Sequence, residues 1–231
     1  MPEPARPVRT SKAEQTRATI ADAAMRLFRR DGYDGTTMRA IAREAGVSVG
    51  NAYYYFASKE HLIQAFYDGM QVEHAERSVA VLAREQAFDR RLRGVLEAWL
   101  EVAAPNHEFA GQFFKNAAEP TSPLSPFSPE STPAREASTD IFRAVVAGSD
   151  VKVAKALREE LPELLWLMHM GIVLFWVHDR SPGQARTHAL VARAVPMVDK
   201  LVRLSRLPGV RGVVDDLLEL LRSLRTAGPP V

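Results

Sequence analysis

The sequence predicts an all-α protein, and three observations support this fold class. Apolar residues recur at intervals of three and four along most of the chain, the spacing that places them on one face of a helix. No stretch alternates apolar and polar residues as a half-buried strand does. The 231 residues are 46% hydrophobic and 25% charged, which is the composition of a soluble globular protein. We therefore expect helices packed around one large core, or around a small and a medium one.

The first predicted helix begins at Ser11 and ends near Arg30. Ser11 and Glu14 have the spacing of a capping box, in which each side chain satisfies a backbone amide of the other residue. The residues expected on its buried face are Ile20, Ala23, Ala24, Leu27 and Phe28. Residues 1–10 are rich in proline and lack the apolar run of a signal peptide, so we expect a disordered arm there.

Two shorter helices joined by a tight turn are predicted within residues 36–59. An apolar stripe runs from Met38 to Ala45, and Gly46 is placed to end that helix because glycine adopts a left-handed conformation without a Cβ penalty. Ser48 is placed to cap the amino end of the next helix. This layout is typical of the helix-turn-helix motif, whose second helix docks in the major groove of DNA.

The second helix, residues 49–56, has an outward surface suited to DNA. Ala52 and Phe56 lie four residues apart and face inward, so the three tyrosines at 53–55 cannot all lie in the core. A phenol offers an apolar ring and a hydroxyl that can reach a phosphate oxygen, and Asn51 can pair with a base edge. The distribution of charge also favours DNA binding. Residues 1–59 carry ten Lys or Arg against six Asp or Glu, whereas the net charge of the whole chain is only +2.

Residues 36–62, with the preceding helix and the corner at Gly32 and Tyr33, resemble the DNA-binding domain of the tetracycline-repressor (TetR) family. The matching positions are Thr36, Thr37, Ile41, Ala42, Ala45, Gly46, Val47, Ser48, Gly50, Tyr53, Phe56, Lys59 and Leu62. The family often has histidine where this chain has Tyr55. The resemblance implies a three-helix DNA-binding domain at 11–58 and a larger helical ligand-binding and dimerisation domain at 59–231.

We predict a division of roles on the DNA-binding surface. The residues expected to contact phosphates are Thr37, Tyr53, Tyr54 and Lys59. The residues expected nearest the bases are Arg39, Val49, Gly50 and Asn51. Ser48 and Tyr55 complete the predicted surface.

The rest of the chain is predicted to be helical except for one loop. Helices are expected at 59–84, 88–104, 107–119, 134–147, 151–161, 162–180 and 182–207, with a last one after Gly209. Five prolines place a loop at 120–133, which Leu124 and Phe127 are expected to anchor. The segment 164–177 is so apolar that we expect a helix buried on all sides, too short to span a bilayer. A kink is expected at Pro196.

Two further expectations follow from the resemblance. A two-fold operator requires two recognition helices about 34 Å apart, so the protein is expected to be a homodimer, through segments 162–180 and 182–206. A small-molecule site is expected where aromatic and soft side chains converge, and its ligand is expected to be largely apolar. The candidate lining residues are Trp99, Phe113, Phe114, Trp166, His169, Met170 and Trp176. Taken singly, each is also an ordinary core residue, and His169 needs a hydrogen-bond partner.

Other classes find little support. The chain has no cysteine, and its six histidines form no zinc-hydrolase motif, so neither a metal site nor a cofactor is expected. Residues 46–50, GVSVG, match the nucleophile elbow of serine hydrolases, but that motif requires a preceding strand. The main hypothesis is a cytoplasmic, ligand-responsive repressor that binds a palindromic operator and has no enzymatic activity. A ligand-independent regulator or an activator stays open, as do the operator, the ligand and the role of the loop.

Overall fold

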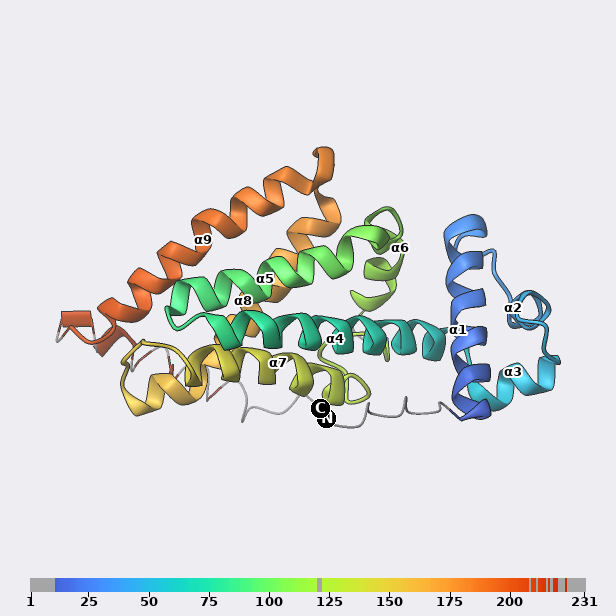
Figure 1. The fold of residues 1–231 in the computed structure, drawn as a ribbon, viewed down its shortest axis with the longest axis horizontal. Coiled ribbons are helices and arrows are strands. Elements are labelled where there is room, and N and C mark those ends of the chain that lie inside the picture. The colour runs from blue at the N-terminus through green and yellow to red at the C-terminus, as the bar shows by residue number, and fades with distance from the viewer. Residues whose placement is uncertain are drawn as a thin grey trace, which may run out of the picture. The chain divides into compact units, whose positions relative to one another are not determined.

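The computed structural model describes residues 11–119 and 122–207, with scattered positions from 209 to 223. The all-α prediction is confirmed, because every regular element in these residues is helical (Figure 1). The helices are α1 (Lys12–Asp31), α2 (Met38–Glu44), α3 (Val49–Tyr55), α4 (Lys59–Arg84), α5 (Phe88–Ala103), α6 (His107–Ala117), α7 (Thr132–Ala147), α8 (Lys155–His178) and α9 (Ala185–Leu204), with short 3-10 turns η1 (Ala104–Asn106) and η2 (Pro182–Gln184). The predicted arm and much of the helix after Gly209 lie outside the described residues.

The chain divides into two compact units. The first holds the residues up to Gly69 together with Gln112–Glu130, so it contains α1, α2, α3 and the beginning of α4. The second holds Met70–Gly111 and the residues from Ser131 onward. Helices α4 and α6 each contribute residues to both units.

Local signals define the ends of α1 as the sequence predicted. The Ser11 hydroxyl accepts a hydrogen bond from the Glu14 amide at 3.2 Å, and the Glu14 carboxylate accepts one from the Ser11 amide at 2.7 Å. Gly32, with φ of 78°, ends the helix in a conformation that favours glycine. All five residues expected on the inner face are buried, and they form part of the core of the first unit.

Helix α4 has the predicted bounds but turns a different side inward along its second half. Val79 belongs to the apolar pattern, yet 67% of its surface is exposed, whereas His74 and Ser78 are buried. The reason is a contact with α5, because the His74 ring lies 2.8 Å from the carbonyl oxygen of Val95 through Nε2. The polar side of α4 therefore faces the interior of the second unit.

The segment 151–180 departs from the prediction in two ways. One helix, α8, runs from Lys155 to His178 through Pro162, where we had expected a new helix to begin. Proline removes one amide donor near the start of this long helix without ending it. The expectation of burial on all sides was wrong, since Leu167, Leu174 and Phe175 are 37–44% exposed. Among the residues that the structure describes, nothing buries this side of α8 fully.

By length and composition, α8 alone among the described helices is long and apolar enough to cross a membrane. The same composition suits a core helix of a soluble protein. Helix α8 packs against α7 and α9. Its buried residues include His169, whose imidazole is polar. We interpret α8 as such a core helix.

The segments beside α8 differ only slightly from those predicted from the sequence. Helix α7 begins two residues earlier than expected, and α9 continues through Pro196 as one helix. In the loop before α7, Leu124 is buried as predicted, but Phe127 is 66% exposed and does not anchor it in the way we expected. Turns stabilised by serine hydroxyls, such as Ser128 donating to Pro123 at 2.9 Å, shape this loop.

Candidate nucleic-acid interface

Helices α2 and α3 and the turn between them are defined by three local features. Gly46 has φ of 68°, which an L side chain rarely adopts, so glycine ends α2 as predicted. The Thr37 hydroxyl accepts from the Ala40 amide at 3.2 Å and caps α2. The Ser48 hydroxyl accepts from the Asn51 amide at 3.1 Å and caps α3. These caps fix the start of each helix, so the layout of a helix-turn-helix is present.

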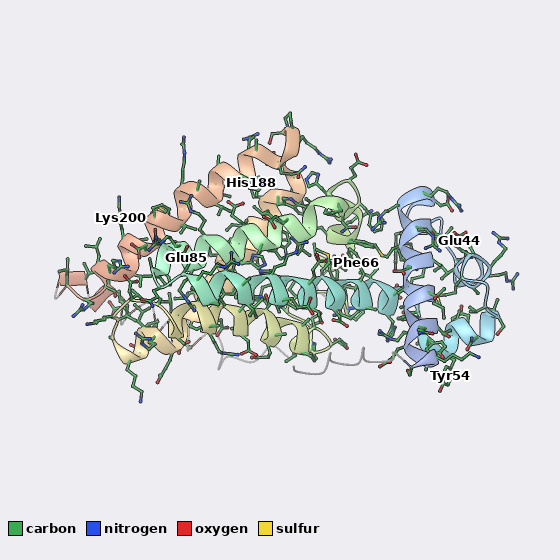
Figure 2. The ribbon with its side chains drawn as sticks, viewed as in Figure 1. Glu44, Tyr54, Phe66, Glu85, His188 and Lys200 are labelled. Atoms are coloured by element: carbon green, nitrogen blue, oxygen red, sulfur yellow. The ribbon has the colours of Figure 1, made fainter. Side chains whose placement is uncertain are left out.

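Helix α3 is anchored on one side and exposed on the other. Ala52 is fully buried, and Phe56 at the end of α3 is 2% exposed with the Arg17 guanidinium 4.9 Å from its ring centroid. Tyr53 and Tyr54 are 51% and 81% exposed, and Figure 2 shows Tyr54 projecting from α3. A large exposed aromatic surface on a short helix is unfavourable in water unless it serves an interaction.

The other predicted DNA-binding residues lie around this surface. Arg39, Ser48, Val49 and Gly50 are exposed, as is Thr37, and Asn51 is half-buried beside the cap of α3. Tyr55 is half-buried, and its ring meets that of Tyr54 edge to face with centroids 5.2 Å apart. Nine of the ten predicted DNA-binding residues therefore lie on α2 or α3 or at the caps that precede these helices.

Lys59 differs from the others because it already has partners within the unit. Its ammonium donates to the carbonyl oxygen of Tyr33 at 2.7 Å and lies 4.1 Å from the centroid of that ring. The Tyr33 hydroxyl in turn donates to Glu60 at 2.5 Å. Burial and the nearby Glu60 carboxylate raise the pKa of Tyr33 above its usual range. Lys59 thus ties α4 to the corner after α1, a role that its sequence position did not reveal.

The GVSVG match has a local structural explanation. Ser48 lies between α2 and α3, and its hydroxyl caps a helix. No strand precedes it in the described part of the chain. The context that a nucleophile elbow requires is therefore missing.

The predicted ligand-binding residues are divided between the two units. In the second unit, the Trp99 ring lies 5.0 Å from His169 and 5.2 Å from Trp176 between centroids, and α8 also carries Trp166, which is buried, and Met170, which is half-buried. Phe113 and Phe114 belong to the first unit. The Phe113 ring contacts there are with Phe28, Phe66 and Tyr67. The group on α5 and α8 also contains the buried imidazole of His169.

Sequence reasoning missed the polar residues of α4 beside this aromatic group. The His74 and His169 rings stack with centroids 6.0 Å apart. Gln71 and Ser78 lie on the same side of α4 as His74, at intervals of three and four residues. This spacing of polar residues was visible in the sequence, but the apolar pattern on the neighbouring side concealed it.

The fold and this surface define a class of protein, a helix-turn-helix regulator with a second, larger helical unit. Comparison with protein families agrees. Residues 20–66 match the family of bacterial regulatory proteins named tetR, and residues 91–220 match the tetracyclin repressor-like C-terminal domain. The chain belongs to the tetracycline-repressor (TetR) family.

Curated relatives are similar over the DNA-binding region. The probable HTH-type transcriptional regulator YttP of Bacillus subtilis is 41% identical over 58 residues, which are 23% of this chain and 28% of that protein. The HTH-type transcriptional regulator TtgR of Pseudomonas putida is 42% identical over 63 residues, or 27% and 30% of the two chains. The chain thus matches less than a third of the length of these relatives.

Solved structures share the fold over most of the chain. A TetR transcriptional regulator from Nitrosomonas europaea superposes with a TM-score of 0.61 at 18% identity, covering 79% of this chain and 97% of that one. FadR from Bacillus subtilis, in complex with stearoyl-CoA, gives 0.60 at 17% identity and covers 77% and 97%. At these identities the likeness concerns the fold.

Proposed function

We propose that the protein is a dimeric, ligand-responsive transcriptional repressor that binds a palindromic DNA operator. The observation that carries this proposal is the exposed polar and aromatic side of α3, opposite the buried Ala52 and Phe56. A helix anchored in this way presents its outer side to the major groove in helix-turn-helix proteins. The caps at Thr37 and Ser48 hold that side in place.

The proposed DNA contacts follow from side-chain chemistry. Hydroxyls of Tyr53 and Tyr54 donate to phosphates, which fixes the register of α3 on the duplex. Asn51, near the start of α3, contacts a base edge and contributes sequence preference. Lys59 retains ammonium hydrogens beyond the one bound to Tyr33, so it contributes a charged contact to the backbone. Arg39, Val49 and Gly50 lie nearest the bases, with Thr37 on a phosphate.

The proposed dimer uses α8 and α9, within segments 162–180 and 182–206. Large apolar residues on these helices are exposed in the single chain: Leu167, Leu174 and Phe175 on α8, and Met197, Leu201 and Leu204 on α9. The α8 residues lie seven and eight positions apart from Leu167, and the α9 residues follow one another at four and three positions, so each set lies on one side of its helix. Two such stripes on adjacent helices match the needs of a symmetric four-helix interface, and a symmetric dimer carries two recognition helices.

A small-molecule effector is proposed to bind in the second unit, near Trp99, His169 and Trp176. The FadR structures that share this fold contain lauroyl-CoA and stearoyl-CoA, which shows that related folds bind ligands with long apolar portions. An effector that binds better to one arrangement of the dimer than to the other shifts the population away from the DNA-binding form. The protein acts where the chromosome lies, in the cytoplasm.

Selection of bound sequences from a pool of random DNA duplexes tests this function. The expected result is a palindromic site with half-sites about one helical turn apart, bound with a strong dependence on salt. Two protein chains are expected on each selected duplex, as measured by sedimentation. If the full chain binds all duplexes equally, or binds none at low ionic strength, the proposed function is wrong.

A further inference from the structure

Four polar side-chain atoms in the second unit are buried without a hydrogen-bond partner among the described residues. They are Gln71 Nε2, His74 Nδ1 and Ser78 Oγ of α4, and His169 Nδ1 of α8. His74, Ser78 and His169 are each at most 2% exposed. We call these four residues the polar cluster. Leaving a buried polar group unpaired is unfavourable, so four together are unusual.

The residues of the polar cluster share one region of the second unit. Gln71, His74 and Ser78 share a side of α4, one turn apart, and the His74 ring stacks on that of His169. Aromatic rings surround His169, with Trp99 5.0 Å and Phe142 5.6 Å from it between centroids. Polar atoms at one end and flat apolar rings beside them are the usual composition of a small-molecule site.

The protonation of His74 is fixed by its partner. The carbonyl oxygen of Val95, 2.8 Å from Nε2, can only accept, so Nε2 carries the hydrogen. Burial lowers the pKa of His74, which keeps the ring neutral, and Nδ1 therefore has a free lone pair. His74 thus needs a hydrogen-bond donor. The Gln71 amide nitrogen needs an acceptor, and the Ser78 hydroxyl serves as either.

The charge state of the polar cluster determines which ligands can bind there. Burial and the neighbouring His74 lower the pKa of His169 to about 3, so this ring is neutral as well. The cluster itself contains no lysine, arginine or carboxylate. An anionic or cationic group placed there would lose its hydration without gaining an opposite charge. A hydroxyl group donates one hydrogen bond and accepts others, and so matches His74, Ser78 and Gln71 together.

We propose that the polar cluster binds the hydroxyl group of an uncharged effector with a flat apolar body, such as a phenol or a hydroxylated polycyclic compound. This inference rests on the proposed ligand response and narrows the ligand from largely apolar to hydroxyl-bearing. The hydroxyl donates to His74 Nδ1 and accepts from Ser78 or Gln71. Its apolar body contacts Trp99.

Three probes that differ in one group test the inference on the full chain. They are 2-naphthol, 2-methylnaphthalene and 2-naphthoate, with binding measured by tryptophan fluorescence and by thermal shift. We expect 2-naphthol to bind at least tenfold more tightly than the other two. Equal binding of 2-methylnaphthalene would overturn the inference, and so would tighter binding of 2-naphthoate or the absence of binding by all three.

Matched variants localise the binding. Ser78→Ala removes an unpaired hydroxyl, so the variant is expected to be as stable as the parent without ligand and to bind 2-naphthol at least fivefold more weakly. Ser205→Ala is the control, because that buried hydroxyl already donates to Val202 at 2.6 Å and lies outside the cluster. An unchanged 2-naphthol affinity in Ser78→Ala would mean that only water occupies the cluster, and the inference fails. DNA binding without 2-naphthol, measured in parallel, reports separately on the proposed function.

Discussion

The Arg91 side chain of α5 binds the end of α7, donating from Nη2 to the carbonyl oxygen of Ala144 at 2.7 Å. Its remaining donors reach the carbonyls of Val145 at 3.0 Å, Leu82 at 2.7 Å and Glu85 at 2.6 Å. One buried guanidinium therefore satisfies backbone acceptors at the carboxyl ends of both α4 and α7, where helix dipoles favour a cation. Desolvation lowers the pKa of Arg91 from its usual high value.

Replacing this side chain should destabilise the second unit. Arg91→Met leaves four carbonyl oxygens without these donors, and we expect the free energy of unfolding to fall by about 3 kcal/mol. Urea denaturation measures this change. The control is Arg90→Met, since Arg90 is exposed and pairs with Glu85 at the surface, and its loss should cost less than about 1 kcal/mol. Equal effects of the two substitutions would contradict the role given to Arg91.

Gly148 lies so close to the Arg91 guanidinium that a side chain at position 148 would clash with it. A Cβ at residue 148 would lie 2.4 Å from Arg91 Nη2, and four hydrogen bonds hold that nitrogen's guanidinium in place. The backbone of Gly148 has φ of −91°, so alanine itself is not strained there. Gly148→Ala should destabilise the native chain by about 1–3 kcal/mol and cost much less when combined with Arg91→Met. Additive effects in this double-mutant cycle would refute the coupling.

Asp179 makes stability depend on pH at the corner between α8 and α9. Its carboxylate is buried and accepts hydrogen bonds from the amides and hydroxyls of Ser181 and Thr187. Burial alone would raise the pKa of Asp179, but these bonds outweigh it and hold the pKa far below its usual range. A depressed folded pKa stabilises the protein above the unfolded value of about 3.9, and this contribution is lost as the pH falls.

We therefore expect Asp179→Asn to lower the free energy of unfolding at pH 7 by about 2 kcal/mol. Between pH 5 and pH 3 the parent should lose stability more steeply than the variant. Chemical denaturation across this range measures both slopes. Asp140→Asn, which changes a surface ion pair on α7, should keep the parent's slope. Parallel curves for the parent and Asp179→Asn would show that this carboxyl is not responsible.

The exposed stripe on α9 predicts the effect of a charge at the dimer interface. Leu201→Lys places an ammonium where two apolar helices are proposed to meet, and dissociation into monomers should follow because a buried unpaired charge is costly. Sedimentation velocity measures the change in mass. Val79→Lys is the matched control, since Val79 is 67% exposed on α4, outside the stripe. A dimer that persists in Leu201→Lys would show that the interface does not include this stripe of α9.

The sequence predicted the helix-turn-helix because its signals act over a few residues. Gly46, Ser48 and the pair of Ser11 and Glu14 each fix a helix end through contacts within three or four positions. Such contacts do not depend on the rest of the fold. The bounds of α4 were predictable for the same reason, since an uninterrupted helical pattern runs through it.

The buried side of each long helix was harder to predict, because neighbouring helices decide it. Arg91 reads as a surface residue, since arginine is rarely buried unless it is paired, and only the ends of α4 and α7 explain its position. Val79 fits an apolar stripe, yet His74 and Ser78 occupy the interior because His74 bonds to α5. The exposed side of α8 is likewise explained by the dimer interface that we propose.

The most direct test of the central claim is DNA selection repeated with two variants on the outer side of α3. Asn51→Ala should alter the preferred base at one position of each half-site, because Asn51 is proposed to contact a base. Tyr54→Phe removes one phosphate contact, so it should weaken binding to all sequences while the selected site stays the same. If Asn51→Ala selects the same site with the same affinity as the parent, the outer side of α3 does not read DNA.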